Sequence, residues 1–312
     1  NTSTSAVSGF VSSGQGSTIG ESTNFQVASQ VARSKSWRST HTQTLRNAPD
    51  GSCDLAAGKQ TANCYVIQAP GTYTFPLVYG NALNSDGSSN NNAFGTASFV
   101  DHNGVIIDSP YIYLTHGSAN VPYDACIVWQ DAPHLVTPSS VQLTSDKHSI
   151  QFTVERKNIC QGNCVIAVRD KNQNIMWSWH IWVTDYNPDE HTYAYDNNGD
   201  GVTDYYFMDR NLGALTDDAN NPNSVGCFYQ GGRNTPFPTS SVTFPGEGAS
   251  VADIQLFGHN GNKPKIKVEA IWGDDQGQSI RRVLKDPLLF ISAKGEPYSW
   301  VTTNPNASND LA

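Results

Sequence analysis

Short runs of β-branched and aromatic residues follow one another along the chain, and Pro, Gly, Asn or Asp separates each run from the next. From residue 64 onward the runs are CYVIQAP, GTYTFPLVYG, GVIIDSPYIYL, ACIVWQ, VQLTS, SIQFTVE, CVIAVRD and IMWSWHIWVTD. Many short strands with turn signals at this spacing are typical of an all-β sandwich. No segment of convincing length shows the helical period of apolar positions. The pattern predicts an all-β fold with few or no helices.

The same pattern divides the chain into three parts. Residues 1–50 are rich in Ser, Thr and Gly, which predicts a linker or the end of a preceding domain, with weak strands at NFQVASQVA and SWRSTHTQTLR. Residues 51–186 contain the regular runs and are predicted to form the β-sandwich domain. Residues 187–312 are dense in turn residues, so we expect a turn-rich, mainly β second domain there. Its further strands are predicted at DIQLFGHNG, KIKVEAIWG and RRVLKDPLLFISAKG.

Polar uncharged side chains dominate the composition and narrow the range of partners. Of the 312 residues, 38% are hydrophobic and only 15% are charged, and the net charge is −9 with no basic stripe. This balance argues against nucleic acid or an anionic membrane surface as a partner. No apolar run approaches the roughly 18 residues of a transmembrane segment. Because the chain begins without Met and without a signal segment, we expect a mature product or a fragment.

The chain has six cysteines, and an even number in a Ser-, Thr- and Asn-rich sequence favours disulfides and an oxidising compartment. Two of them, Cys160 and Cys164, flank a glycine-containing turn in CQGNC, which predicts a hairpin crossed by a disulfide. The same spacing fits two zinc ligands, although no second close pair follows, and a catalytic thiol is a third alternative. The pairing of the others stays open: Cys53, Cys64, Cys126 and Cys227.

The segment YDNNGDGVTD, residues 195–204, has the spacing of a calcium-binding loop. Calcium takes about six to eight oxygen ligands, and three carboxylates in one short loop repel unless a cation neutralises them. The predicted ligands are the side chains of Asp196, Asn198, Asp200 and Asp204 and the backbone carbonyl of Val202. The twelfth loop position lacks the Glu of helix–loop–helix sites, and the flanking TYAY and YYFM predict strands. The loop is similar to calcium loops in β-hairpins of integrin-type propeller repeats; the alternative is a solvated turn.

Residues 175–183, IMWSWHIWV, form the densest aromatic segment. In a strand, Trp177, Trp179 and Ile181 share one face, whereas His180 and Trp182 share the other. One interpretation is a surface on which the three tryptophans stack against a glycan. The interpretation that we favour is a central strand buried on one or both faces, with His180 hydrogen-bonded, because Trp is usually largely buried.

Catalytic motifs are missing from the sequence. Neither GxSxG nor HExxH occurs, and the acidic residues cluster in turns such as TDD and GDD rather than in a pattern typical of glycosidases. We therefore expect a protein that is not an enzyme.

Several blocks in order resemble the fimbrillin-like surface proteins of Bacteroides-type bacteria. They are ANCYVIQAPGTYTFPLVYGNAL (62–83), IVWQDAPHLVT (127–137), QGNCVIAVRDKNQNIMWSWHIWVTDY (161–186), FMDRNLGAL (207–215) and CFYQGGRNTPFP (227–238). The resemblance implies an exported β-sandwich protein, pilus-associated or anchored at the outer membrane as an adhesin-like component. Two segments depart from the usual pattern of this family, namely CQGNC and DNNGDGVTD. The usual Trp-Arg-Val-Pro segment is also missing, so we expect the last domain to be incomplete, trimmed or completed by another chain.

These observations together predict a structural or adhesive subunit at the bacterial cell surface or in an outer-membrane appendage. Its expected partners are other surface or pilus subunits, a glycan or a host ligand. An open sheet edge should then accept or donate a strand, with residues 1–50 as the exchanged segment. The alternatives are a glycan-binding surface protein and a secreted glycan-active hydrolase.

Overall fold

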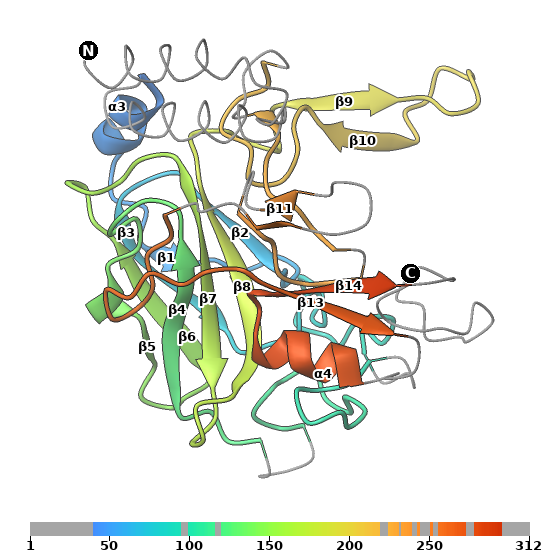
Figure 1. Cartoon of the computed structure of the whole chain (residues 1–312). Helices are drawn as coiled ribbons and strands as arrows, with labels where there is room; N and C mark the ends of the chain where they lie inside the picture. Colours follow the sequence, from blue (N-terminus) through green and yellow to red (C-terminus); the bar gives the residue numbers. More distant parts are fainter. Residues whose placement is uncertain are drawn as a thin grey trace, which may run out of the picture.

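Two four-stranded sheets form the body of the molecule (Figure 1). The structure, a computed structural model, describes residues 40–94, 99–115, 120–218, 224–230, 232–238, 242–243, 250–251, 255–272 and 278–294. Residues 1–39, which include most of the predicted linker and one of its weak strands, lie outside the described part. The prediction of an all-β fold is confirmed, because the described residues contain only two α-helices, α3 (Thr40–Asn47) and α4 (Gln278–Lys285).

The first sheet, sheet A, has the strand order β1-β3-β6-β5. Its strands are β1 (Cys53–Asp54), β3 (Gly71–Pro76), β6 (Ser149–Val154) and β5 (Gln142–Leu143). Neighbouring strands are antiparallel except β1 and β3, which are parallel. Buried and more exposed residues alternate along β3 and β6, so one face of sheet A points to the core and the other to solvent.

The second sheet, sheet B, has the order β2-β8-β7-β4. Its strands are β2 (Cys64–Ile67), β8 (Ile175–Val183), β7 (Gly162–Arg169) and β4 (Asp124–Gln130). Burial is almost continuous along β7 and β8, because other segments cover both faces of this sheet. The aromatic strand β8 is therefore the buried central strand that its composition favours.

The core between the sheets is built on aromatic contacts. Phe75 of sheet A packs with its ring centroid 5.0 Å from that of Trp179 of sheet B, and Phe152 lies 6.1 Å from Phe75. All three side chains are fully buried. Burying one such side chain is worth roughly 1.5–3 kcal/mol, so this aromatic layer is a major stabilising element of the sandwich.

A second cluster covers the outer face of sheet B. Trp129 of β4 and Val165 of β7 pack there against Phe237, Leu256 and Phe290. The covering segments include the parallel pair β13 (Lys267–Trp272) and β14 (Leu289–Lys294), with α4 between them in the chain. Residues on both sides of position 187 thus share one core, while the boundary predicted there stays a prediction.

Four segments differ from their predicted local structure. Residues 40–46 of the predicted strand SWRSTHTQTLR belong to helix α3, and residues 281–285, the start of the predicted strand RRVLKDPLLFISAKG, belong to helix α4. In α4, Ile280, Val283 and Leu284 have helical spacing and are at least partly buried, so packing of one face stabilises a short helix that propensity alone would not. Residues 104–114 form only isolated bridges, and so do residues 255–261, the described part of the predicted strand DIQLFGHNG. Neither α3 nor α4, the helices of the described part, could cross a bilayer.

The predicted Cys160–Cys164 disulfide is wrong in this structure, where none of the six cysteines forms a disulfide. The expected hairpin does not exist, because β6 and β7 belong to different sheets and residues 155–161 cross between them. Gly162 already begins β7, where Cys164 pairs with Ile181 of β8. Cys160 and Cys164 are both buried in the main core, so their close spacing reflects burial rather than a cross-link. The structure therefore gives no support to the expectation of a disulfide-stabilised protein.

Candidate functional site

A two-stranded hairpin projects from the body of the molecule (Figure 1). It consists of β9 (Thr192–Tyr195) and β10 (Tyr205–Met208), the strands predicted on either side of the acidic loop. In its antiparallel register Tyr195 pairs with Tyr205, and Tyr193 pairs with Phe207. Directly paired residues point to the same side of a ladder, so these four rings lie on one face.

The aromatic face, defined as Tyr193, Tyr195, Tyr205 and Phe207, is open to solvent. The four side chains are exposed by 67%, 51%, 57% and 56%, and on the opposite face Tyr206 is exposed by 70%. The ring of Phe207 lies 6.1 Å from that of Tyr195 and 6.4 Å from that of Tyr205. Contiguous exposed aromatic residues are uncommon on monomeric proteins and mark interaction surfaces.

Both edges of the hairpin are also open. Among the described residues, neither β9 nor β10 pairs with a third strand. Each edge therefore presents unpaired backbone N–H and C=O groups, which an added strand can use. A lone two-stranded ladder is marginally stable in water, so contact with a partner would stabilise this element.

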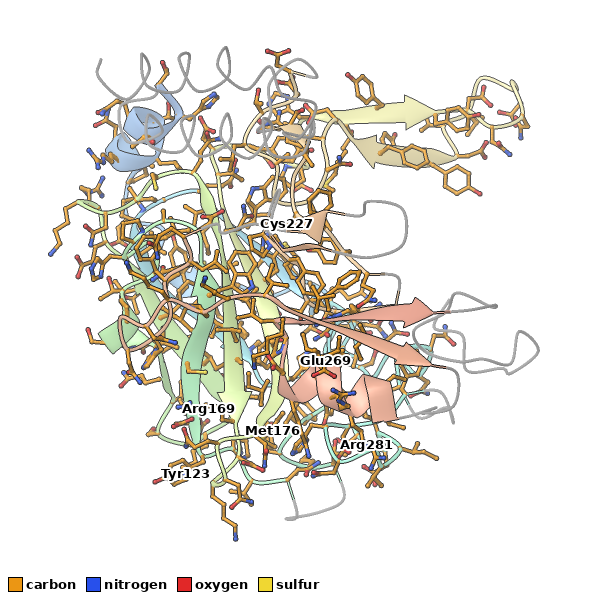
Figure 2. The ribbon with its side chains drawn as sticks, in the orientation of Figure 1. Tyr123, Arg169, Met176, Cys227, Glu269 and Arg281 are labelled. Atoms are coloured by element: carbon orange, nitrogen blue, oxygen red, sulfur yellow. The ribbon has the colours of Figure 1, made fainter. Side chains whose placement is uncertain are left out.

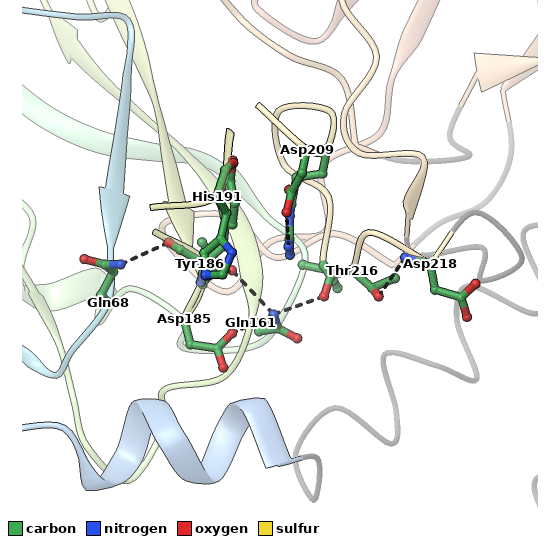
Figure 3. Close-up of polar contacts among 11 residues, drawn as sticks. Gln68, Gln161, Asp185, Tyr186, His191, Asp209, Thr216 and Asp218 are labelled. Atoms are coloured by element: carbon green, nitrogen blue, oxygen red, sulfur yellow. Dashed lines mark hydrogen bonds and ion pairs between the residues drawn. The ribbon is translucent and has the colours of Figure 1, made fainter. Parts of the chain in front are cut away.

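Tyr186 fixes the base of the hairpin to the body (Figure 3). Its hydroxyl donates a hydrogen bond to the carbonyl of His191 at 2.8 Å, and the guanidinium of Arg210 lies 4.0 Å from its ring centroid. Arg210 in turn forms an ion pair with Asp209 at 2.6 Å. On the other side, Gln68 donates to the Tyr186 carbonyl at 3.0 Å. Both ends of the hairpin are thereby held by one aromatic side chain.

Gln161 makes a second connection beneath the hairpin (Figure 3). Its side-chain amide donates to the Leu215 carbonyl at 3.1 Å and to Asp185 at 3.2 Å. Asp185 also accepts a bond from His41 of α3 at 2.9 Å. Gln161 had been predicted as a turn residue, whereas it joins sheet B to the segment that follows the hairpin.

The acidic loop at the hairpin tip is held by its own backbone. Asp196 accepts hydrogen bonds from the amides of Gly199 at 2.7 Å and Gly201 at 2.8 Å. Asp200 accepts one from Val202, and Asp204 accepts one from Asn197, both at 2.8 Å. The amide of Gly201, followed by other loop amides, lowers the pKa of Asp196. These backbone N–H groups offset part of the repulsion among the loop carboxylates.

The calcium prediction stays a prediction. Within the described part of the chain, no group of three or more His, Cys, Asp or Glu side chains is arranged to hold a metal ion. The second carboxylate oxygens of Asp200 and Asp204 have no hydrogen bond in that part, and Asn198 uses its side-chain oxygen for the amide of Asp200. Oxygen ligands of the type that calcium prefers are present, but they do not converge as the loop stands.

The three tryptophans predicted for glycan stacking have different surroundings. Trp179 and Trp182 are fully buried, the former in the main core and the latter with its ring 5.5 Å from that of Tyr186. Trp177 is only partly buried. Its indole N–H donates to Asn63 at 3.2 Å, and its ring meets Tyr79 edge-on at 5.1 Å. Only Trp177 has surface left for a ligand.

A buried chain of polar groups crosses the outer face of sheet B around His180. Asp131 accepts bonds from the backbone and side-chain amides of Asn163 at 2.8 and 3.0 Å. Since that amide nitrogen also donates to Gly213, the Asn163 oxygen is left as an acceptor. His180 Nε2 lies 2.9 Å from this oxygen and therefore carries the proton.

The other ring nitrogen of His180 is consequently an acceptor. Cys64 Sγ lies 3.3 Å from it and Tyr229 Oη 3.1 Å from it. The thiol of Cys64, the imidazole of His180 and the amide of Asn163 lie in the same order as the groups of a catalytic Cys–His–Asn triad. Burial, however, raises the pKa of Cys64 to about 12 and lowers that of His180 to about 3. Both groups are neutral at pH 7, so the geometry supports a structural role. The only sequence signal for this cluster was a histidine within a buried strand.

Comparison with family models, with characterised proteins and with solved structures gave no significant match. The fimbrillin-like resemblance therefore stays a prediction from the residues that carry it.

Proposed function

We propose that this chain is an exported cell-surface protein that adheres to, or assembles with, other surface or pilus subunits through the β9–β10 hairpin. The observation that carries the proposal is the aromatic face, four neighbouring rings that are each more than half exposed. The open edges of both strands support it further, because a partner strand can extend the ladder. Extracellular location at the bacterial surface belongs to the same proposal and rests on the β-rich composition and the family resemblance.

The proposal is tested by replacing all four residues of the aromatic face with Ser. The wild type should self-associate with rising concentration in sedimentation velocity experiments and copurify with surface filaments from its native cells. Aromatic anchors typically contribute about 1–2 kcal/mol or more each. The fourfold variant should therefore associate at least about 100-fold more weakly. Its melting temperature should not fall, because the replaced rings contribute little to the core.

The matched control replaces exposed apolar residues elsewhere: Leu114, Val121 and Tyr123, exposed by 53%, 54% and 57%, each to Ser. This control variant should associate and copurify like the wild type. A wild type that stays monomeric at all concentrations and is never found with filaments would rule the proposal out. An equal loss in both variants would show that general surface hydrophobicity, and not the hairpin, drives association.

A further inference from the structure

A cavity of about 210 Å³ lies beside Trp177 and shares no residue with the hairpin. It is formed where β8, the segment after β3, residues 232–234 and helix α4 meet. Helix α4 packs against β8 in this region (Figure 2). The apolar part of its wall includes Tyr79, Phe99, Trp177, Ile280, Val283 and Leu284.

Trp177 is held in one orientation at this wall. Its only polar atom is used by the bond to Asn63, and Tyr79 packs edge-on against its ring. The rest of the indole surface is apolar and faces a space that the described side chains leave empty. A fixed aromatic ring beside a ring-sized space is suited to a flat partner with an apolar face.

Side-chain amides supply the polar part of the wall. Asn63 uses its oxygen for Trp177, and its amide N–H group makes no hydrogen bond within the described residues. The backbone of Gly80, with φ +49°, approaches the Asn63 amide so closely that a Cβ would lie 2.8 Å from its nitrogen. Asn81 lines the cavity with an exposed side chain, and Asn234 is fixed by a bond to the Ser178 carbonyl at 3.1 Å.

Arg233 brings a positive charge to the same wall. Its guanidinium donates to the carbonyls of Pro287, at 2.9 Å, and of Leu289, and it lies 4.6 Å from the ring centroid of Phe237. Among the described residues it has no ion pair with a carboxylate. Burial lowers the pKa of Arg233 to about 9, because the charged form lacks solvent. Asp286 offsets this effect in part, and a further anionic group in contact with the guanidinium would stabilise its charge.

We propose that the cavity binds a single sugar ring that bears a carboxylate. The apolar face of the ring lies against Trp177, the hydroxyl groups bond to the amides of Asn63 and Asn81, and the carboxylate neutralises Arg233. The volume fits one ring, since it is smaller than the about 300–1,000 Å³ of pockets for drug-sized ligands. The net charge of −9 opposes an anion only weakly, because charges beyond about 8 Å are screened at physiological ionic strength.

The test is titration of the whole chain with D-glucuronic acid, followed by ligand-observed NMR and tryptophan fluorescence. D-glucose, which lacks the carboxylate, and acetate, which lacks the ring, are the comparison ligands. Glucuronate should bind saturably in the millimolar range, and each comparison ligand at least tenfold more weakly. Absence of saturable glucuronate binding, or equal binding of glucose or acetate, would overturn the proposal.

Single-residue variants test whether glucuronate binds in this cavity. Asn81→Ala removes an exposed side chain that makes no hydrogen bond within the described residues, and it should weaken glucuronate binding about three- to tenfold. Asn92→Ala, at an exposed asparagine outside the wall, should not weaken binding. Ile280→Trp should fill the cavity and abolish binding. Unchanged binding in both Asn81→Ala and Ile280→Trp would refute the site. The hairpin variant with four Ser residues should bind glucuronate normally, so this inference and the proposed function can fail separately.

Discussion

Gly213 lies where the chain after the hairpin crosses the outer face of sheet B. Its φ is +80°, and a Cβ at this position would lie 2.5 Å from Cys227 Sγ and 2.8 Å from Asn163 Oδ1. Its carbonyl accepts a hydrogen bond from Asn163. Both the backbone conformation and the close contact require glycine here.

Gly213→Ala should therefore destabilise the protein by roughly 2–6 kcal/mol, from about 1–3 for the backbone conformation and about 1–3 for overpacking. Gly261→Ala is the matched control, because Gly261 has a similar φ of +72° but nothing within 4 Å of a Cβ. Gly261→Ala should lose only the backbone part, about 1–3 kcal/mol. Urea unfolding measures the free energy of unfolding of both variants and of the wild type. Equal losses would show that the contact with Asn163 and Cys227 is unimportant.

His180 makes stability depend on pH. Its pKa is lowered by burial from an ordinary value near 6.5 to about 3 in the folded state. Between these two values the unfolded chain binds a proton that the folded chain does not. Stability from this group is thus fully present above pH 6.5 and is lost as pH falls toward 3, by up to about 1.4 kcal/mol per pH unit.

Urea midpoints measured at intervals from pH 7.5 down to pH 4.5 test this expectation. The wild type should lose stability on acidification more steeply than His180→Gln, which is less stable at pH 7 but has no imidazole to charge. The comparison of slopes removes contributions from carboxylates that both proteins share. Parallel curves would mean that His180 is not the group responsible.

At the scale of elements, the β9–β10 hairpin differs from the strands of the sheets. It has no third strand in the described part and no buried face, and its base depends on the contacts of Tyr186. Its loop is ordered by hydrogen bonds from its own amides. An ion that joined the loop carboxylates would stabilise this element and, through its base, the body.

Calcium should raise the melting temperature of the wild type relative to chelator. At a calcium concentration about 100 times the dissociation constant, the free energy of unfolding should rise by about 2.7 kcal/mol if unfolding releases the ion. Asp200→Ala removes one carboxylate and should melt alike with calcium and with chelator, whereas Asp218→Ala, outside the loop, should respond like the wild type. Identical curves for the wild type in calcium and chelator would show that residues 195–204 are only a turn.

At the scale of the whole molecule, stability comes from packing on both faces of sheet B rather than from cross-links. Sheet A covers one side of sheet B, and segments after residue 209 cover the other. Burial raises the pKa of Cys64, Cys126 and Cys164, which keeps these thiols protonated. The proposal of an extracellular location therefore draws no support from disulfides.

Thiol titration of the protein denatured without reductant should give six thiols per chain. The melting temperature should not change on adding reductant, because no bond is there to break. Four or fewer thiols would contradict the structure and restore a disulfide-stabilised interpretation. A loss of thiols only after prolonged storage would be distinguished by titrating freshly purified protein.

The alternation of apolar and polar residues determined β3 and β6 of sheet A, because a strand with one buried face repeats every two residues. Short runs of β-branched and aromatic residues between turn residues marked β7 and β8 of sheet B, which are buried on both faces. TYAY and YYFM predicted the hairpin. The glycines and Asn residues of the acidic loop marked the turn between them. The sequence also identified His180 and Trp182 as sharing one face of β8, although not what covers that face.

Tertiary structure decided the rest. Local pattern cannot show that β6 and β7 belong to different sheets, so it could not exclude a Cys160–Cys164 hairpin. It could not show that Asp131, Asn163 and His180 meet, or that α4 closes a cavity over Trp177, because these contacts join residues far apart in the chain. Burial decides which tryptophan is left for a ligand and which cysteine is inert, and burial is a property of the packed molecule.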